Sequence, residues 1–213
     1  MKKTRLLLIL FLASALLCVF ADNVFAAVGC DLNDPDRDVK RLFPVSTGYK
    51  TEYLSIDKLG GQSLLKEVET RLGDNFQGLY ETIDVPYTVY TIYKGKETIG
   101  YIHGINQKGT YGGLQVFLGY DTRGNITNFY YQKLTSKASD MRSSGFAKQF
   151  VGLSLSDFKD YDPKTGKSGN QRVTAIKNPN TESAADFNST LRAVKKNLIL
   201  MDIFVFNKKE AGK

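Results

Sequence analysis

Residues 173–200 read VTAIKNPNTESAADFNSTLRAVKKNLIL, a stretch that predicts a strand, a short polar loop and a long amphipathic helix. Ser183 and Asp186 form an S-x-x-D capping pattern at the predicted helix start. The spacing of three and four residues places six apolar side chains on one helical face: Ala184, Phe187, Leu191, Val194, Leu198 and Met201. Because a helix start offers unpaired N–H groups, the stretch predicts either a phosphate site or a capped helix that binds nothing.

The N-terminus has the pattern of a secretory leader. Lys2, Lys3 and Arg5 precede an apolar run over residues 6–20, and small residues follow at Ala26 and Ala27. The run is shorter than the roughly 20 residues that a membrane-spanning helix needs. We therefore predict export to the periplasm or to the extracytoplasmic face of a bacterial membrane.

Two processing routes fit the end of this leader. Ordinary cleavage after Ala26 makes residues 1–26 a signal peptide. Alternatively, residues 27–30, AVGC, resemble a lipoprotein box, so that the leader is 1–29 and Cys30 carries the lipid. In that second route the acidic stretch 31–38, DLNDPDRD, is a tether. The lipid anchor gives Cys30 a role, since the other cysteine of the chain, Cys18, lies in the leader.

The composition excludes several classes of site. One histidine, His103, and a single cysteine beyond the leader argue against a disulfide, a CxxC centre, a c-type haem site, structural zinc and a Ser-His-Asp triad. The net charge is +7, but lysines and acids are interspersed. We therefore expect no nucleic-acid partner, and some attraction to a membrane surface or an anionic cofactor.

The periodicity of the chain predicts an α+β domain, in which helices pack against an antiparallel sheet of about four to six strands. A helix over 62–72 ends at Gly73. Alternating apolar residues predict one hairpin over 88–105 and a second that joins 112–120 to 126–134. A short helix within 135–157 follows, and 203–206 adds a strand or extends the last helix. The predicted boundaries are 27–60 for a tether and lead-in, 61–207 for the domain and 208–213 for a tail.

Several of these pieces together resemble the FMN-binding domain family, to which the flavin-bearing subunits of Rnf and sodium-translocating NADH:quinone reductase complexes belong. The resemblance covers residues 101–200. It rests on Gly112-Gly113, the D-x-x-G-x-I hairpin at 121–126, Phe150-Val151-Gly152, and the polar loop before the last helix. It implies an FMN-binding-domain-like fold, FMN as cofactor, and membrane electron-transport subunits as partners.

The sequence departs from the family pattern at two places. Residues 134–138, LTSKA, lack the proline and glycines of the family's Glu-Thr-Pro-Gly-Leu-Gly segment, and Glu182 stands where the family's threonine forms a phosphoester with FMN. A noncovalent site implied by the resemblance would use Thr181, Ser183 and Asn178 on the phosphate. Gly112 and Gly113 would then approach the ring, with Lys137 or Lys177 neutralising phosphate charge.

Two functional hypotheses follow from this sequence. The first is an exported electron carrier, or an accessory subunit of a membrane electron-transport complex, whose redox activity comes from bound flavin alone. The alternative is a degenerate flavin-domain protein of the envelope that acts as an interaction or assembly module without cofactor. A hydrolase ranks third, because His103 would have to serve as its only histidine.

Overall fold

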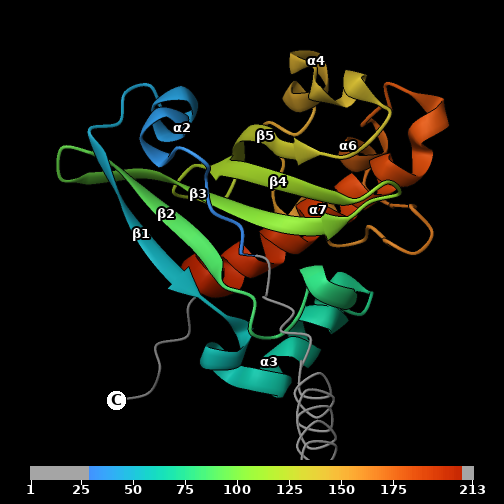
Figure 1. Ribbon diagram of the computed structural model, residues 1–213, viewed down its shortest axis with the longest axis horizontal. Coiled ribbons are helices and arrows are strands. Elements are labelled where there is room, and N and C mark those ends of the chain that lie inside the picture. The colour runs from blue at the N-terminus through green and yellow to red at the C-terminus, as the bar shows by residue number, and fades with distance from the viewer. Residues whose placement is uncertain (1–28, 208–213) are drawn as a thin grey trace, which may run out of the picture.

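A five-stranded antiparallel sheet forms the centre of the computed structural model, which describes residues 29–207 (Figure 1). The strands follow one another in chain order: β1 (Gly48–Leu54), β2 (Tyr87–Lys94), β3 (Glu97–Lys108), β4 (Gly113–Tyr120) and β5 (Ile126–Leu134). The predicted α+β class and both predicted hairpins are confirmed. The cleavage site after Ala26 and the tail 208–213 lie outside the described residues, which begin at Gly29.

Helices cover both faces of the sheet. Helix α2 (Pro35–Leu42) lies on one face, where Phe43 packs with Ile102 and Phe117. Helices α3 (Ile56–Leu72) and α7 (Ala184–Met201) cover the other face, which contributes Ile105 and Val116 to the larger core. Because alternate residues of each strand point to opposite faces, both cores come from the same strands. No helix within residues 29–207 combines the length and apolar character needed to cross a bilayer.

The segment predicted as a tether and lead-in belongs to the folded domain, so the predicted boundary at residue 61 is wrong. Asp34 caps α2 by accepting a hydrogen bond from the Arg37 N–H at 3.2 Å, and Pro35 occupies the first turn. The same segment supplies β1 and the start of α3, which Ser55 caps. Gly61, with a φ of 57°, interrupts α3 where the predicted helix begins. The predicted end at Gly73 is confirmed, since that residue has a φ of 78°.

The segment 172–176, predicted as a strand, instead holds the end of a short helix, and that prediction is wrong. Helix α6 (Gln171–Thr174) begins at Asn170, whose side chain accepts a hydrogen bond from the Arg172 N–H at 2.8 Å. Val173 and Ile176 are both buried and three residues apart, which is a helical spacing. A run this short does not show its period clearly, so a strand and a helix are hard to tell apart from the sequence. The other short elements are η1 (Gly78–Tyr80), η2 (Ser139–Arg142), α4 (Ser144–Lys148), α5 (Leu155–Phe158) and η3 (Thr181–Ser183).

Helix α7 is more deeply buried than an amphipathic helix on a surface. Its predicted apolar face is buried from Leu191 to Met201, although Ala184 is exposed. Every residue from Thr190 to Met201 is buried, because the sheet, α3 and α5 all contact this part of the helix. A π-helix, η4 (Asp202–Phe206), extends it, so residues 203–206 add no strand.

His103 lies fully buried between β3 and α7. Its Nδ1 bonds with the Asn197 Oδ1 at 2.6 Å, and Tyr120 donates its hydroxyl hydrogen to the same oxygen at 2.8 Å. Burial lowers the pKa of His103 to about 4, the nearby Lys196 charge adds to this shift, and the Asn197 hydrogen bond opposes it. The imidazole is therefore neutral in the folded protein near neutral pH.

This pKa predicts a loss of stability in acid. Between pH 6.5 and 4 the unfolded chain binds a proton at His103 that the folded chain does not, so the free energy of unfolding falls as the pH falls. The loss reaches up to about 3 kcal/mol. Denaturant unfolding of wild type and His103→Gln across this range should show the difference between their stabilities shrinking toward pH 4. A constant difference would contradict the prediction.

Candidate functional site

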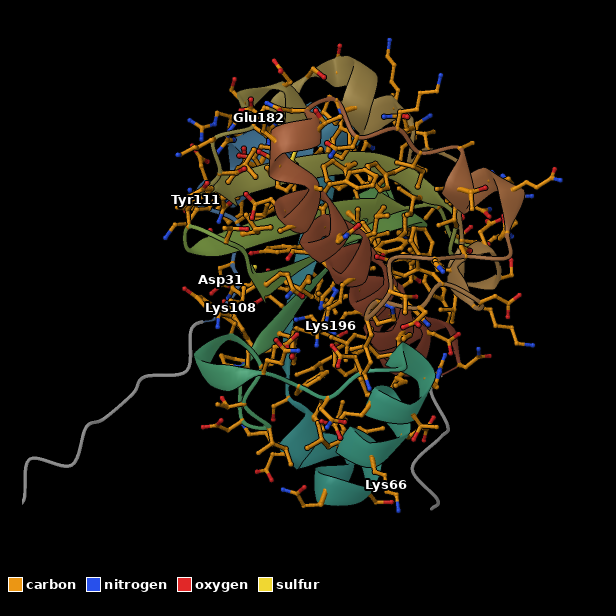
Figure 2. The ribbon with its side chains drawn as sticks, turned by 90° about the vertical axis from the view of Figure 1, so that its right-hand side faces the viewer. Asp31, Lys66, Lys108, Tyr111, Glu182 and Lys196 are labelled. Atoms are coloured by element: carbon orange, nitrogen blue, oxygen red, sulfur yellow. The ribbon has the colours of Figure 1, made fainter. Side chains whose placement is uncertain are left out.

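The turn between β3 and β4 packs against the first turn of α7. Within the turn, the Gly109 N–H donates to the Gly112 carbonyl at 2.8 Å. The Thr110 N–H donates to the Asp186 Oδ1 at 2.7 Å, which joins the turn to the helix. Figure 2 shows Tyr111 on the turn and Glu182, in η3 just before α7, on the same side of the molecule. The structure therefore brings together two segments that the sequence predicts as parts of one site.

Gly112 ends this turn and Gly113 begins β4, but protein side chains already occupy the space beside both residues. A Cβ at Gly112, whose φ is 144°, would lie 3.0 Å from the Thr135 Cγ2. A Cβ at Gly113 would lie 3.1 Å from the Tyr80 ring. The close approach that glycine permits here serves Thr135 and Tyr80.

Lys137 reaches the same turn from the segment after β5. Its ammonium lies 5.1 Å from the centre of the Tyr111 ring, and the Tyr111 side chain is 52% exposed. This geometry is a cation–π contact at the surface. Lys137 and Tyr111 together present a positive charge and an aromatic ring to solvent beside the start of α7.

The loop before α7 satisfies its own hydrogen bonds. Asn178 accepts from the Asn180 N–H at 3.1 Å, and Asn180 accepts from the Glu182 N–H at 3.0 Å. The Asn180 carbonyl also accepts from the Ser183 N–H. Ser183 is buried and its side chain makes no capping hydrogen bond, so the predicted capping pattern with Asp186 is wrong. Of the predicted phosphate contacts, Thr181 is exposed and Asn178 is half-buried and bonded within the loop.

Two carboxylates stand at this helix start. Asp186 is 1% exposed, and its Oδ2 finds no hydrogen-bond partner within the described chain. Glu182 is exposed one turn earlier. A carboxylate at a helix N-terminus interacts favourably with the helix dipole and repels a second anion. The protein's own acids thus take the electrostatic position that a phosphate would need.

Cys30, the candidate lipid attachment site, is buried at the edge of β2. Its side chain is 1% exposed, it forms a parallel bridge with Tyr87, and burial raises the pKa of its thiol. Hydrogen bonds also hold both neighbours of Cys30: the Asn106 side chain donates to the Gly29 carbonyl, and the Thr88 hydroxyl donates to the Asp31 side chain. Acylation of this thiol would require the segment to leave the sheet.

A buried charged network is the part of the structure that sequence reasoning missed. Arg192 and Lys196, both on α7, converge on Glu81, which is 4% exposed. Arg192 also donates to Asp74 at 2.8 Å and to Gln107 at 2.7 Å. Figure 2 shows Lys196 in the interior, below α7. Arg192 and Lys196 lie on the polar side of the predicted helix, where charges usually face water, so the sequence carries no signal for this cluster.

The network also supplies the floor of a polar groove of about 510 Å³ between the β3–β4 turn and α7. Arg192 lies at its base, and Lys108 and Lys164 lie at its sides. All the nitrogens of the Arg192 guanidinium already donate to protein acceptors. The Arg192 guanidinium therefore stabilises the fold and has no free N–H group for a ligand in the groove.

Comparison with known proteins adds no family to this geometry. No protein-family model matches the chain, and no curated protein matches it. The inference of function therefore depends on the residues themselves.

Proposed function

We propose that the chain is an exported α+β domain, similar in layout to an FMN-binding domain, that acts as a non-catalytic interaction or assembly module of the bacterial envelope. The observation that carries this proposal is the pair of carboxylates, Glu182 and Asp186, at the start of α7. A flavin phosphate carries nearly two negative charges, and here it would meet two more at close range.

The packing beside the turn supports the same proposal. Thr135 and Tyr80 fill the space next to Gly112 and Gly113, where the resemblance would place the ring. Glu182 has no hydroxyl with which to form the phosphoester of the family. Covalent FMN does not fit these residues, and we derive no redox step through it.

A second candidate is a noncovalent flavin site for extracytoplasmic electron transfer, with membrane electron-transport subunits as partners. One observation favours it: Tyr111 and Lys137 are accessible at the turn that Thr110 joins to α7, and Thr181 is exposed in the loop before that helix. There Thr181 and Asn178 would contact the phosphate, and Lys137 would offset part of its charge. The bound flavin would supply the electron-transfer chemistry.

Titration with FMN distinguishes the two candidates. We expect no quenching of flavin fluorescence and no rise in melting temperature, whereas a ligand at 100 times its Kd stabilises a binder by about 2.7 kcal/mol. Glu182→Thr removes the exposed carboxylate and serves as the matched variant. Binding by wild type would establish the second candidate, and binding by Glu182→Thr alone would show that the acid excludes the phosphate.

Export is part of the proposal, and the burial of Cys30 favours ordinary cleavage after Ala26 over the lipid anchor. In this route the exported chain stays at the extracytoplasmic side through its partners or through attraction to the membrane surface, while Cys30 remains a free thiol in the sheet. The intact mass of the protein from the membrane fraction tests this. A diacylglyceryl adduct on a chain beginning at Cys30 would restore the lipoprotein route.

A further inference from the structure

Strand β1 forms an edge of the sheet (Figure 1). Its seven residues, Gly48–Leu54, pair with β2 in an unbroken antiparallel register. Among residues 29–207 no other strand pairs with β1. The strand contains no proline and no bulge, two features that commonly protect sheet edges from pairing with other chains. A long, regular edge of this kind can accept another strand.

The sequence of β1, GYKTEYL, is self-complementary about its centre. We propose that a second copy of this chain pairs with β1 in antiparallel orientation, with Thr51 opposite Thr51 on a two-fold axis. This register places Lys50 opposite Glu52 of the second copy, and Tyr49 opposite Tyr53. Opposite-charge, aromatic and threonine pairs are among the cross-strand pairs that stabilise antiparallel strands.

The side chains on one face of β1 are already arranged for this pairing. Tyr49 is held by its hydroxyl, which donates to Asp36 at 2.8 Å, and by an edge-to-face contact with Tyr90 at 5.8 Å. Tyr53 on the same face is 66% exposed, the highest exposure among the large apolar side chains of residues 29–207. Pairing would bring the exposed Tyr53 ring of each copy beside the positioned Tyr49 ring of the other.

The charges on the opposite face identify the occupant. Lys50 and Glu52 lie 3.2 Å apart along the strand, and their side chains are 63% and 39% exposed, so their contact within one copy contributes little. In the two-fold arrangement each lysine gains a glutamate across the strand, and all four charges alternate in sign. An arbitrary extended peptide would not match this order, whereas a second copy matches it by symmetry.

An interface built on one strand edge is small, so we expect weak association that depends on protein concentration. Sedimentation velocity on the mature chain from micromolar to millimolar concentration should show a monomer–dimer equilibrium. Lys50→Glu and Glu52→Lys each place like charges opposite one another twice, and each should weaken the dimer at least tenfold.

Mixing these two variants gives the decisive measurement. In a heterodimer, Lys50→Glu presents two acids and Glu52→Lys presents two lysines, so both cross-strand pairs become attractive again. The mixture should associate more strongly than either variant alone, and the double charge-swapped chain should recover wild-type dimerisation. Lys66→Glu, on the outer side of α3 (Figure 2), is the control for net charge and should leave the dimer unchanged.

Two results would overturn the proposal. One is a wild-type chain that remains monomeric at millimolar concentration. The other is a dimer that both single variants retain and that mixing does not alter, since this would place the interface elsewhere. Lys50 is exposed and Glu52 is partly exposed, so circular dichroism should confirm that every variant keeps the fold. The edge lies away from the FMN titration site, and the two experiments fail independently.

Discussion

Replacing Glu81 by alanine is expected to lower the free energy of unfolding by about 3–5 kcal/mol. Glu81 is the only carboxylate among the described residues that contacts both Arg192 and Lys196. Its removal leaves two cations inside the protein with too few acceptors. A buried charge that loses its partner costs far more than a surface ion pair contributes.

The surroundings of Lys196 explain why this loss is large. Its side chain is fully buried, and besides Glu81 its ammonium donates to the Asn106 carbonyl at 2.7 Å. Burial lowers the pKa of Lys196 and would raise that of Glu81, but the Lys196 and Arg192 charges bring the pKa of Glu81 below its usual value. Each ion in the network therefore depends on the others for its charged state.

Urea unfolding followed by circular dichroism measures the effect. Glu67→Ala is the control, because Glu67 forms an exposed ion pair with Arg71 at 3.7 Å and should cost less than about 0.5 kcal/mol. A further variant separates lost charge from lost packing. Glu81→Leu combined with Lys196→Met removes both ions and should lose less stability than the two single changes summed. A Glu81→Ala cost below about 1 kcal/mol would contradict the prediction.

The strands β2 to β5 were predictable because each combines alternating apolar residues with a glycine-containing turn. Strand β1 was not predictable, since both faces of GYKTEYL are partly exposed to solvent at the sheet edge and its apolar alternation is weak. The acidic stretch before it looked like a tether. Its helix α2 is fixed instead by the Asp34 cap and by tertiary packing of Val39 and Phe43, which a local pattern does not reveal.

The candidate site divides in the same way. The sequence grouped the β3–β4 turn, Lys137 and the start of α7 in one candidate site. It did not predict which side chains occupy that site, because Asp186 contacts Thr110 and Tyr80 packs beside Gly113 from distant parts of the chain. The cations of α7 show the limit most clearly. Arg192 and Lys196 are buried against Glu81, while Lys195 is buried where it donates to the Tyr161 carbonyl, and none of these partners is near α7 in the sequence.

Replacing Gly100 by alanine is expected to destabilise the protein by about 3 kcal/mol or more. Gly100 lies in β3, where a Cβ would come within 2.2 Å of the Tyr120 carbonyl oxygen and 2.7 Å of the Phe43 ring. The first atom belongs to the backbone of the neighbouring strand, and the second belongs to the residue that anchors the end of α2. Neither can move without separating β3 from β4 or lifting α2 from the sheet.

A loss of stability here would show a steric clash, because alanine in regular structure is otherwise more favourable than glycine. Gly145→Ala is the matched control: this residue is the second of α4, and a Cβ there meets nothing within 4 Å. We expect that variant to be as stable as wild type or more stable by up to about 1 kcal/mol. Thermal and urea unfolding of both variants measure the contrast. If Gly100→Ala were equally harmless, α2 would not pack as closely on β3 as the Phe43 contact requires.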